Sequence, residues 1–220
     1  FKQKTAYEML RSLVGSEMCI RDRSSSNKRN EDIMFIQTEE TPNPSTLKFL
    51  PGREVLPNGS MDFRSEQDAK KSPLAEALFN VDGVVGVFLS DDFITITKRD
   101  DKDWHLMKPG LLGVIMEHFT ANRPVIISDD ENSKSGSSVQ DEDEDVVLQI
   151  KELLYTRVRP AVAQDGGDIV FEDFTDGTVT VQMRGACAGC PSSTATLKMG
   201  IENMLRHYIP EVKEVVAAEM

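Results

Sequence analysis

A strongly acidic segment divides the 220-residue chain into two parts, each the size of a small domain. Eight of the residues from Asp129 to Asp145 are Asp or Glu, and Lys134 is the one base among them. Such a segment repels itself and has little apolar surface to bury, so it favours an extended, flexible linker. The alternative is a docking tail for a basic partner. The sequence therefore predicts two small domains, at residues 34–128 and 146–220, joined by an acidic linker at 129–145.

The net charge and the cysteine count exclude several classes of protein. The net charge of −12 would repel nucleic-acid phosphates, so we expect no nucleic-acid partner. Apolar runs are all strand-sized and fall short of the roughly 20 residues that cross a bilayer, so we expect no membrane span. An odd count of three cysteines argues against a disulfide scaffold and favours a reducing compartment, with the thiols available for metal or redox chemistry.

The first residues of the chain differ in character from the rest. The chain begins with Phe1, and Ser12–Arg23 resembles a translated sequencing adapter. The alternative is a transit peptide, because the segment is basic and contains serines. We expect residues 1–33 to be a non-native or disordered leader with the biological start at Met34, and Cys19 is given no role.

Residues 34–128 combine short strand patterns with two helical patterns, which predicts a mixed α+β domain. Ser72 and Pro73 are typical of a helix N-cap and first position. We expect Thr41–Pro44 to be a rigid turn or a recognition surface, and Trp104 to belong to the core. The expected elements are strands at Met34–Thr38 and Thr46–Leu50, a helix from Pro73, a hairpin of Val84–Leu89 and Phe93–Thr97, a helix over Trp104–Thr120 that kinks or begins at Pro109, and a strand at Val125–Ile127.

Residues 146–220 predict a domain of α-β-β-α-β order, so the whole chain is α+β. Apolar residues recur at steps of three and four from Val147 to Val162, which indicates a helix over Val146–Val162. We interpret Asp165–Asp168 as a stop for this helix, and a metal or phosphate loop is the alternative. The later elements are strands at Ile169–Phe174 and Thr178–Met183 around an Asp176-Gly177 turn, a helix capped by Ser192 or Ser193 that runs to about Tyr208, and a strand at Val212–Ala217.

Cys187 and Cys190 form a C-x-x-C pair, which is the spacing that lets two sulfur atoms reach one metal atom. The residues around them are Gly or Ala, so the backbone can wrap closely and direct N–H groups at thiolates. The pair precedes a predicted helix N-terminus, where the helix dipole favours negative charge. Arg184 lies close enough in sequence to balance the charge of a bound cluster, although an ordinary surface role is equally consistent.

Two cysteines supply only half of a tetrahedral site. His105, His118 and His207 are all distant from the motif in sequence, and His207 is about four helical turns away. A second copy of the chain would complete the site by twofold symmetry, giving four thiolates that suit either zinc or an iron–sulfur cluster. Inert cysteines and a dithiol-disulfide oxidoreductase are the alternatives. The motif follows a hairpin, which argues against the dithiol enzyme, since thioredoxin-like motifs follow the first strand of a βαβ unit.

The residues around these motifs resemble a known family. Arg157–Ile169 and Gly185–Leu197 resemble the NifU C-terminal (Nfu) domain, and Phe35–Gly52 resembles the Nfu N-terminal domain. The resemblance implies a non-enzymatic scaffold or carrier that holds a 4Fe–4S cluster between two protomers, with Cys187 and Cys190 as ligands. A 2Fe–2S cluster and zinc are the less favoured cargoes.

The same resemblance implies partners and a compartment. An upstream assembly scaffold would supply the cluster, and apo iron–sulfur enzymes would receive it. A start at Met34 leaves no targeting segment, so we expect the bacterial cytoplasm. The mitochondrial matrix is the alternative, because the two-domain layout also resembles matrix homologues.

Overall fold

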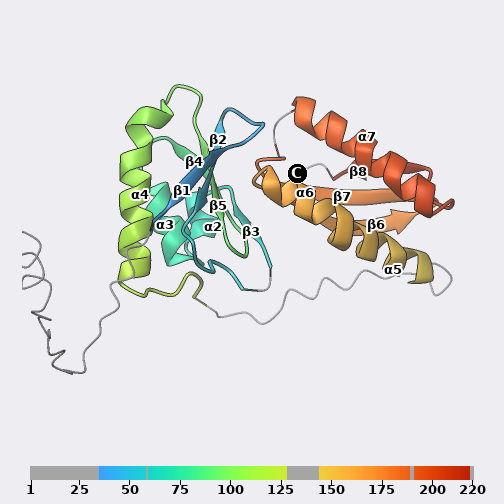
Figure 1. Ribbon diagram of the computed structural model, residues 1–220, viewed down its shortest axis with the longest axis horizontal. Helices are drawn as coiled ribbons and strands as arrows, with labels where there is room; N and C mark the ends of the chain where they lie inside the picture. The colour runs from blue at the N-terminus through green and yellow to red at the C-terminus, as the bar shows by residue number, and fades with distance from the viewer. Residues whose placement is uncertain (1–34, 58, 128–143, 189–190, 219–220) are drawn as a thin grey trace, which may run out of the picture. The chain divides into compact units, whose positions relative to one another are not determined.

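The computed structural model describes residues 35–57, 59–127, 144–188 and 191–218 (Figure 1). These residues form a five-stranded and a three-stranded sheet, each with its own helices, and the predicted α+β class is confirmed. The predicted leader, nearly all of the predicted linker and Cys190 lie outside the described residues.

The five-stranded sheet is antiparallel throughout, with the strand order β1-β2-β5-β4-β3. The hairpin of β4 and β5 was predicted. The first strand begins three residues later than predicted, and β3 was not predicted because three residues are too few to show an alternation. The strands are β1 (Gln37–Glu40), β2 (Thr46–Leu50), β3 (Met61–Phe63), β4 (Val84–Leu89) and β5 (Ile94–Lys98).

Three helices accompany this sheet: α2 (Glu66–Ala69), α3 (Pro73–Phe79) and α4 (Trp104–Thr120). The Ser72 hydroxyl caps α3 by accepting from the Ala75 N–H, as predicted. Helix α4 begins at Trp104 and not at Pro109, because the Asp103 side chain caps it by accepting from the His105 N–H. The strand predicted at Val125–Ile127 is wrong. The segment instead makes two hydrogen bonds to the residues just before α3: the Val125 carbonyl accepts from the Ser72 hydroxyl, and the Ile127 N–H donates to the Lys71 carbonyl.

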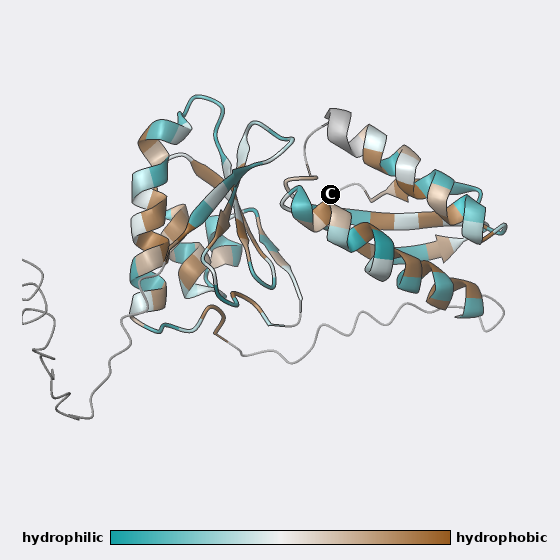
Figure 2. Ribbon diagram, in the orientation of Figure 1, coloured by the Kyte–Doolittle hydropathy of each residue, from teal (hydrophilic) through white to brown (hydrophobic). Residues whose placement is uncertain are grey.

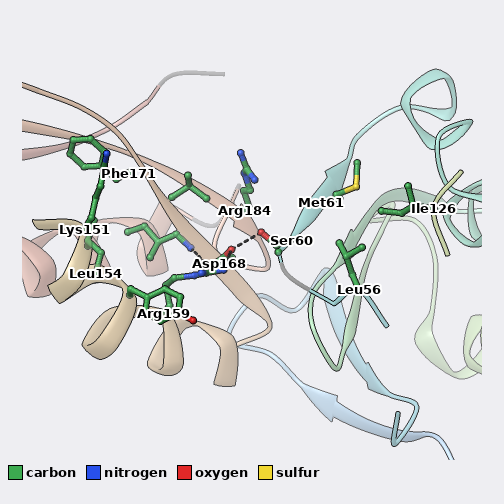
Figure 3. A pocket seen from close by; sticks show the side chains of 14 residues that line it. Leu56, Ser60, Met61, Ile126, Lys151, Leu154, Arg159, Asp168, Phe171 and Arg184 are labelled. Atoms are coloured by element: carbon green, nitrogen blue, oxygen red, sulfur yellow. Dashed lines mark hydrogen bonds and ion pairs between the residues drawn. The ribbon is translucent and has the colours of Figure 1, made fainter. Parts of the chain in front are cut away.

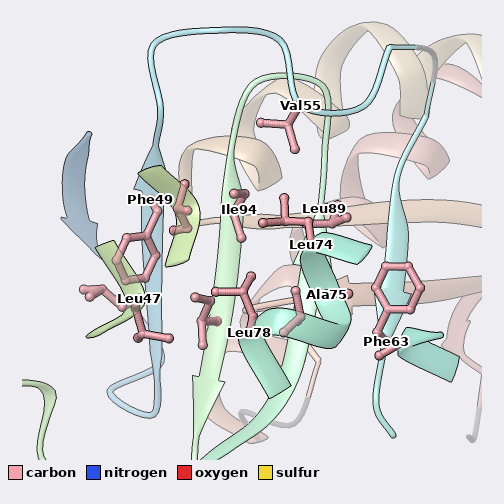
Figure 4. Close-up of a cluster of buried hydrophobic side chains, with 14 of the residues drawn as sticks. Leu47, Phe49, Val55, Phe63, Leu74, Ala75, Leu78, Leu89 and Ile94 are labelled. Carbon is pink, nitrogen blue, oxygen red and sulfur yellow. The ribbon is translucent and has the colours of Figure 1, made fainter. Parts of the chain in front are cut away.

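The first core lies between this sheet and helices α3 and α4 (Figure 4). Leu47 and Phe49 of β2 and Ile94 of β5 are buried against Leu74 and Leu78 of α3. Each such side chain contributes about 1.5–3 kcal/mol when it is fully buried. Trp104 packs against the edge of this core, as predicted.

The three-stranded sheet has the order β6-β7-β8, with strands at Gly167–Thr175, Thr178–Gly185 and Glu214–Ala217. The turn between β6 and β7 has positive φ at both Asp176 and Gly177, which is the geometry that an Asp-Gly hairpin requires. Strands β7 and β8 are parallel, so they need a crossover, and α7 (Pro191–Tyr208) supplies it.

The helix predicted over Val146–Val162 is divided into three pieces. These are α5 (Glu144–Leu153), a π-helical segment η1 (Leu154–Val158) and α6 (Arg159–Gln164). Helix α5 begins at Glu144, inside the stretch predicted to be linker. The predicted apolar stripe from Val147 to Val162 is buried in one cluster with Ile201 and Leu205 of α7, and Figure 2 shows apolar and polar residues alternating along these helices. Tyr208, the last residue of α7, is half-exposed.

Candidate functional site

Cys187 lies in the turn that follows β7, and its side chain is buried with 4% of its surface exposed. The Ala188 N–H donates to the Gly185 carbonyl at 3.1 Å and closes this turn. Strand β7 ends at Gly185 and the 18-residue helix α7 begins at Pro191, so the predicted motif falls between the two in the sequence. The second predicted ligand, Cys190, lies outside the described residues, and its position remains a prediction.

Two glycines in the stretch Asp165–Asp168 form the support on which the Cys187 loop rests. The predicted helix stop is confirmed, because α6 ends at Gln164 and Gly166 adopts the left-handed backbone conformation, with φ of +78°. Its carbonyl accepts from the Ala186 N–H at 3.1 Å. Gly167 pairs with Gly185 in the β6–β7 ladder, and a Cβ atom on Gly167 would lie only 2.7 Å from the Cys187 Sγ.

This contact could not be predicted from the sequence, because only the strand register brings residues twenty positions apart together. The signal that points to it is the pair of adjacent glycines itself, since one glycine would suffice to stop the helix. For the alternative of a metal loop at these residues, the described part of the chain contains no group of three or more His, Cys, Asp or Glu side chains arranged to hold a metal ion. The alternative of a phosphate loop stays a prediction.

The Asp168 carboxylate, which follows the glycines, is a hydrogen-bonding centre (Figure 3). It is nearly buried and accepts from Arg159 Nε at 2.7 Å, Arg159 Nη2 at 2.9 Å and its neighbour Ile169 N at 2.8 Å. The hydroxyl of Ser60 donates to it at 2.5 Å. The hydrogen bond that Arg159 donates to Asp168 is the main cause that raises the pKa of the Arg159 guanidinium, which is charged at every physiological pH.

Arg184 and the predicted turn at Thr41–Pro44 also lie near these loops. Arg184 faces Asp168 across the β6–β7 ladder, and its Nε donates to Gln182 Oε1 at 2.7 Å. A role in balancing cluster charge therefore stays a prediction. The expected turn is present, and the Asn43 carbonyl accepts from both Thr46 N and Thr46 Oγ1. The Asn43 amide also reaches the Ala186 carbonyl, at 3.4 Å.

The three histidines lie on helices α4 and α7, outside the turn that carries Cys187. His118 is buried in α4 within the first core, His105 is exposed near the start of the same helix, and His207 stacks edge-on against Tyr208 at the end of α7. The described helices also include none that is long and apolar enough to cross a membrane.

Comparison with known proteins assigns both parts of the chain. Residues 36–122 match the family described as "Scaffold protein Nfu/NifU N terminal", and residues 150–216 match the "NifU-like domain". NifU-like protein 5, mitochondrial, from Arabidopsis thaliana is 48% identical over 184 residues, which cover 83% of this chain and 67% of that protein. The mitochondrial NFU1 iron-sulfur cluster scaffold homolog from Homo sapiens is 49% identical over 183 residues, covering 83% of this chain and 71% of that protein. The chain therefore belongs to the Nfu/NifU family of scaffold proteins.

Proposed function

We propose that this protein is a non-enzymatic iron–sulfur scaffold that binds a 4Fe–4S cluster between two copies of the chain and transfers it to apo-proteins. The observation that carries the proposal is the placement of Cys187 in the turn after β7, four residues before the first residue of helix α7. Family membership supports the scaffold role, since the human relative is named an iron–sulfur cluster scaffold homolog.

The chemistry of the loop fits such a cargo. Thiolate sulfur is the ligand that iron–sulfur clusters take, and Cys187 supplies one directly after β7. Cys190 would supply the second, immediately before Pro191, the first residue of α7. The positive end of the helix dipole favours both thiolates and the negative charge of a cluster. Two copies would together provide four thiolates, which is a complete ligand set.

Transfer to a client would proceed by exchange of these thiolates for the client's own cysteines. An upstream scaffold would load the cluster by the same exchange in reverse. We further propose that residues 34–128 form a separate domain that docks on clients, and that the acidic residues 129–145 link it to the cluster domain at 146–220.

The mitochondrion is the compartment that we propose. The comparisons do not support the bacterial cytoplasm expected from the sequence, because the plant and human relatives are both described as mitochondrial. Fractionation of cells that express the full natural gene with a C-terminal tag tests the compartment, and cytosolic protein alone would contradict it.

Anaerobic reconstitution of the purified chain with iron and sulfide tests the function. We expect about four irons and four sulfides per dimer, the content of one 4Fe–4S cluster with four cysteine ligands. Cys187→Ala and Cys190→Ala should each abolish the cluster and the dimer, whereas the control Cys19→Ala should leave both unchanged. A wild-type protein that stays colourless and monomeric would rule the function out.

The same preparation separates the alternatives. Elemental analysis distinguishes a zinc-bridged dimer from an iron–sulfur one, and Mössbauer spectra distinguish 2Fe–2S from 4Fe–4S. A dithiol oxidoreductase would instead form a reversible Cys187–Cys190 disulfide and turn over a disulfide substrate. Cluster transfer is measured by adding an apo-ferredoxin and following its spectrum, with no transfer expected from either cysteine variant.

A further inference from the structure

An ion pair brackets the turn that supports the cysteine loop. Arg159 is the first residue of α6, and Asp168 is the second residue of β6. Both guanidinium–carboxylate hydrogen bonds are short, and the Asp168 side chain is only 5% exposed. A bidentate pair fixes orientation as well as distance, so it ties the beginning of a helix to the beginning of a strand across the turn between them.

The turn transmits this restraint to Cys187. Gly167 directly precedes Asp168 and lies against the Cys187 Sγ, while the Gly166 carbonyl holds the Ala186 N–H. Any shift of Asp168 therefore moves the residues that touch the cysteine loop. The ion pair thus reaches the cysteine loop through this turn.

The π-helical segment directs Arg159 toward β6. The buried residues of this stretch are Val147, Ile150, Leu154, Val158 and Val162, so their spacing is three, four, four and four. Four residues of an α-helix rotate by about 400°, so each step of four displaces the next apolar side chain by about 40° around the helix. The π-helical turn at η1 contains more residues per turn and so reduces this displacement. Helix α6 then starts with Arg159 facing Asp168, and the guanidinium also lies over the Tyr155 ring, 5.4 Å from its centre.

We propose that Arg159 and Asp168 are positioning residues for Cys187: their ion pair holds the Gly166–Gly167 turn in place, and the turn sets where the thiol stands. The consequence for cluster binding rests on the proposed function. The positioning of Cys187 is a property of the chain without a bound cluster, so positioning and cluster binding can be tested separately.

Amide hydrogen exchange in the full-length apo-protein tests the positioning. Arg159→Lys keeps the charge but loses the bidentate fork, and Asp168→Asn removes the charge with little change in size. We expect each variant to accelerate exchange of the Ala186 amide by about tenfold or more, because breaking a nearly buried ion pair is costly. Exchange at Val179 and Val181, in the middle of β7, should be unchanged. Uniform acceleration at all three amides, or none, would overturn the proposal.

Three control variants separate positioning from general stability. Tyr155→Phe keeps the ring beneath Arg159, and Arg206→Lys alters an arginine at the far end of α7; neither should change Ala186 exchange. Ile150→Val makes a cavity in the same core, remote in sequence from the loop. If it accelerates Ala186 exchange as much as Asp168→Asn does at an equal loss of Tm, the ion pair is merely structural and the proposal fails.

Alkylation of Cys187 and cluster loading complete the test. In a Cys19→Ala, Cys190→Ala background, iodoacetamide should label Cys187 about tenfold faster when Asp168 is changed to Asn. Cluster yield of the variants is then compared with that of the wild type, keeping all cysteines. If the wild type takes up no cluster while the variants still open the loop, the proposed function falls and the positioning stands. If the wild type loads a cluster, but amide exchange and alkylation in the variants match those of the wild type, the positioning alone is overturned.

Discussion

Gly167 and Cys187 approach so closely that the strand residue has no room for a side chain. A Cβ atom at position 167 would lie 2.7 Å from the cysteine Sγ and 2.8 Å from the Arg184 carbonyl oxygen. The second contact is with backbone, which cannot rotate away. Cys187, the candidate ligand, can therefore lie against β6 only because residue 167 has no side chain. The position of the cysteine loop depends on this glycine.

Gly167→Ala should destabilise the protein and impair the cysteine loop together. We expect a loss of about 1–3 kcal/mol in the free energy of unfolding, as for other overpacked core sites, measured by urea titration. Cluster yield in reconstitution should fall as well. The control is Gly200→Ala on α7, where a Cβ meets nothing within 4 Å and the helix should gain up to about 1 kcal/mol. Equal stability of the two variants would show that the loop tolerates a methyl group.

Ser72→Ala should be one of the costlier single-atom deletions in the first domain. The buried hydroxyl accepts from the Ala75 N–H at 3.2 Å and donates to the Val125 carbonyl at 2.5 Å. Loss of the cap and of the second hydrogen bond should together cost about 2 kcal/mol. Ser65→Ala, which removes the more exposed cap of α2, should cost about 1 kcal/mol or less. Urea midpoints of the two variants give the comparison, and equal midpoints would contradict it.

The features that the sequence predicted correctly are those whose chemistry is local. Ser72 and Pro73 start a helix by themselves, and Asp176-Gly177 carries the positive φ angles that its turn needs. The contact between Gly167 and Cys187 could not be predicted, because it depends on the register of two strands. The ion pair of Arg159 and Asp168 was missed for a related reason, since it requires the phase of the helix to be known.

The π-helical segment is an intermediate case. Its signal was present in the sequence as three successive steps of four along the apolar stripe, which drift by about 120° around an uninterrupted α-helix. The proposed half-site character of the C-x-x-C pair likewise comes from the sequence, because it follows from counting the available ligands. Which side chains support the loop was accessible only from the fold.

His118 should make the protein less stable in mild acid. Its side chain is 2% exposed, and neither ring nitrogen has a hydrogen-bond partner among the described residues. Burial lowers the pKa of His118 from 6.5, and the nearby positive charge of Arg123 lowers it further. The folded state therefore binds fewer protons than the unfolded state, so the free energy of unfolding decreases as the pH falls below about 6.5 and through the lowered pKa.

Replacing the imidazole tests this pH dependence. His118→Leu should flatten the fall in Tm between about pH 7 and pH 5, because the group that gains a proton on unfolding is gone. Exposed His105→Gln is the matched control and should leave the slope as it is. A wild-type slope in His118→Leu would mean that other groups cause the acid sensitivity.

Deleting Thr156 from the π-helical segment should be tolerated, although deletions inside helices usually are not. Without this exposed residue, the buried positions that begin with Val147 and Ile150 would be spaced three, four, three and four, which suits an ordinary α-helix. Both halves of the helix would keep their apolar faces on the core, and the Tm by circular dichroism should stay close to that of the wild type. Deleting Gln149 from α5 is the contrasting change, because it rotates Val147 away from the core by about 100° and should forfeit its burial, about 1.5–3 kcal/mol. If the Thr156 deletion is as damaging as the Gln149 deletion, the π-helical turn does more than restore the phase of the stripe.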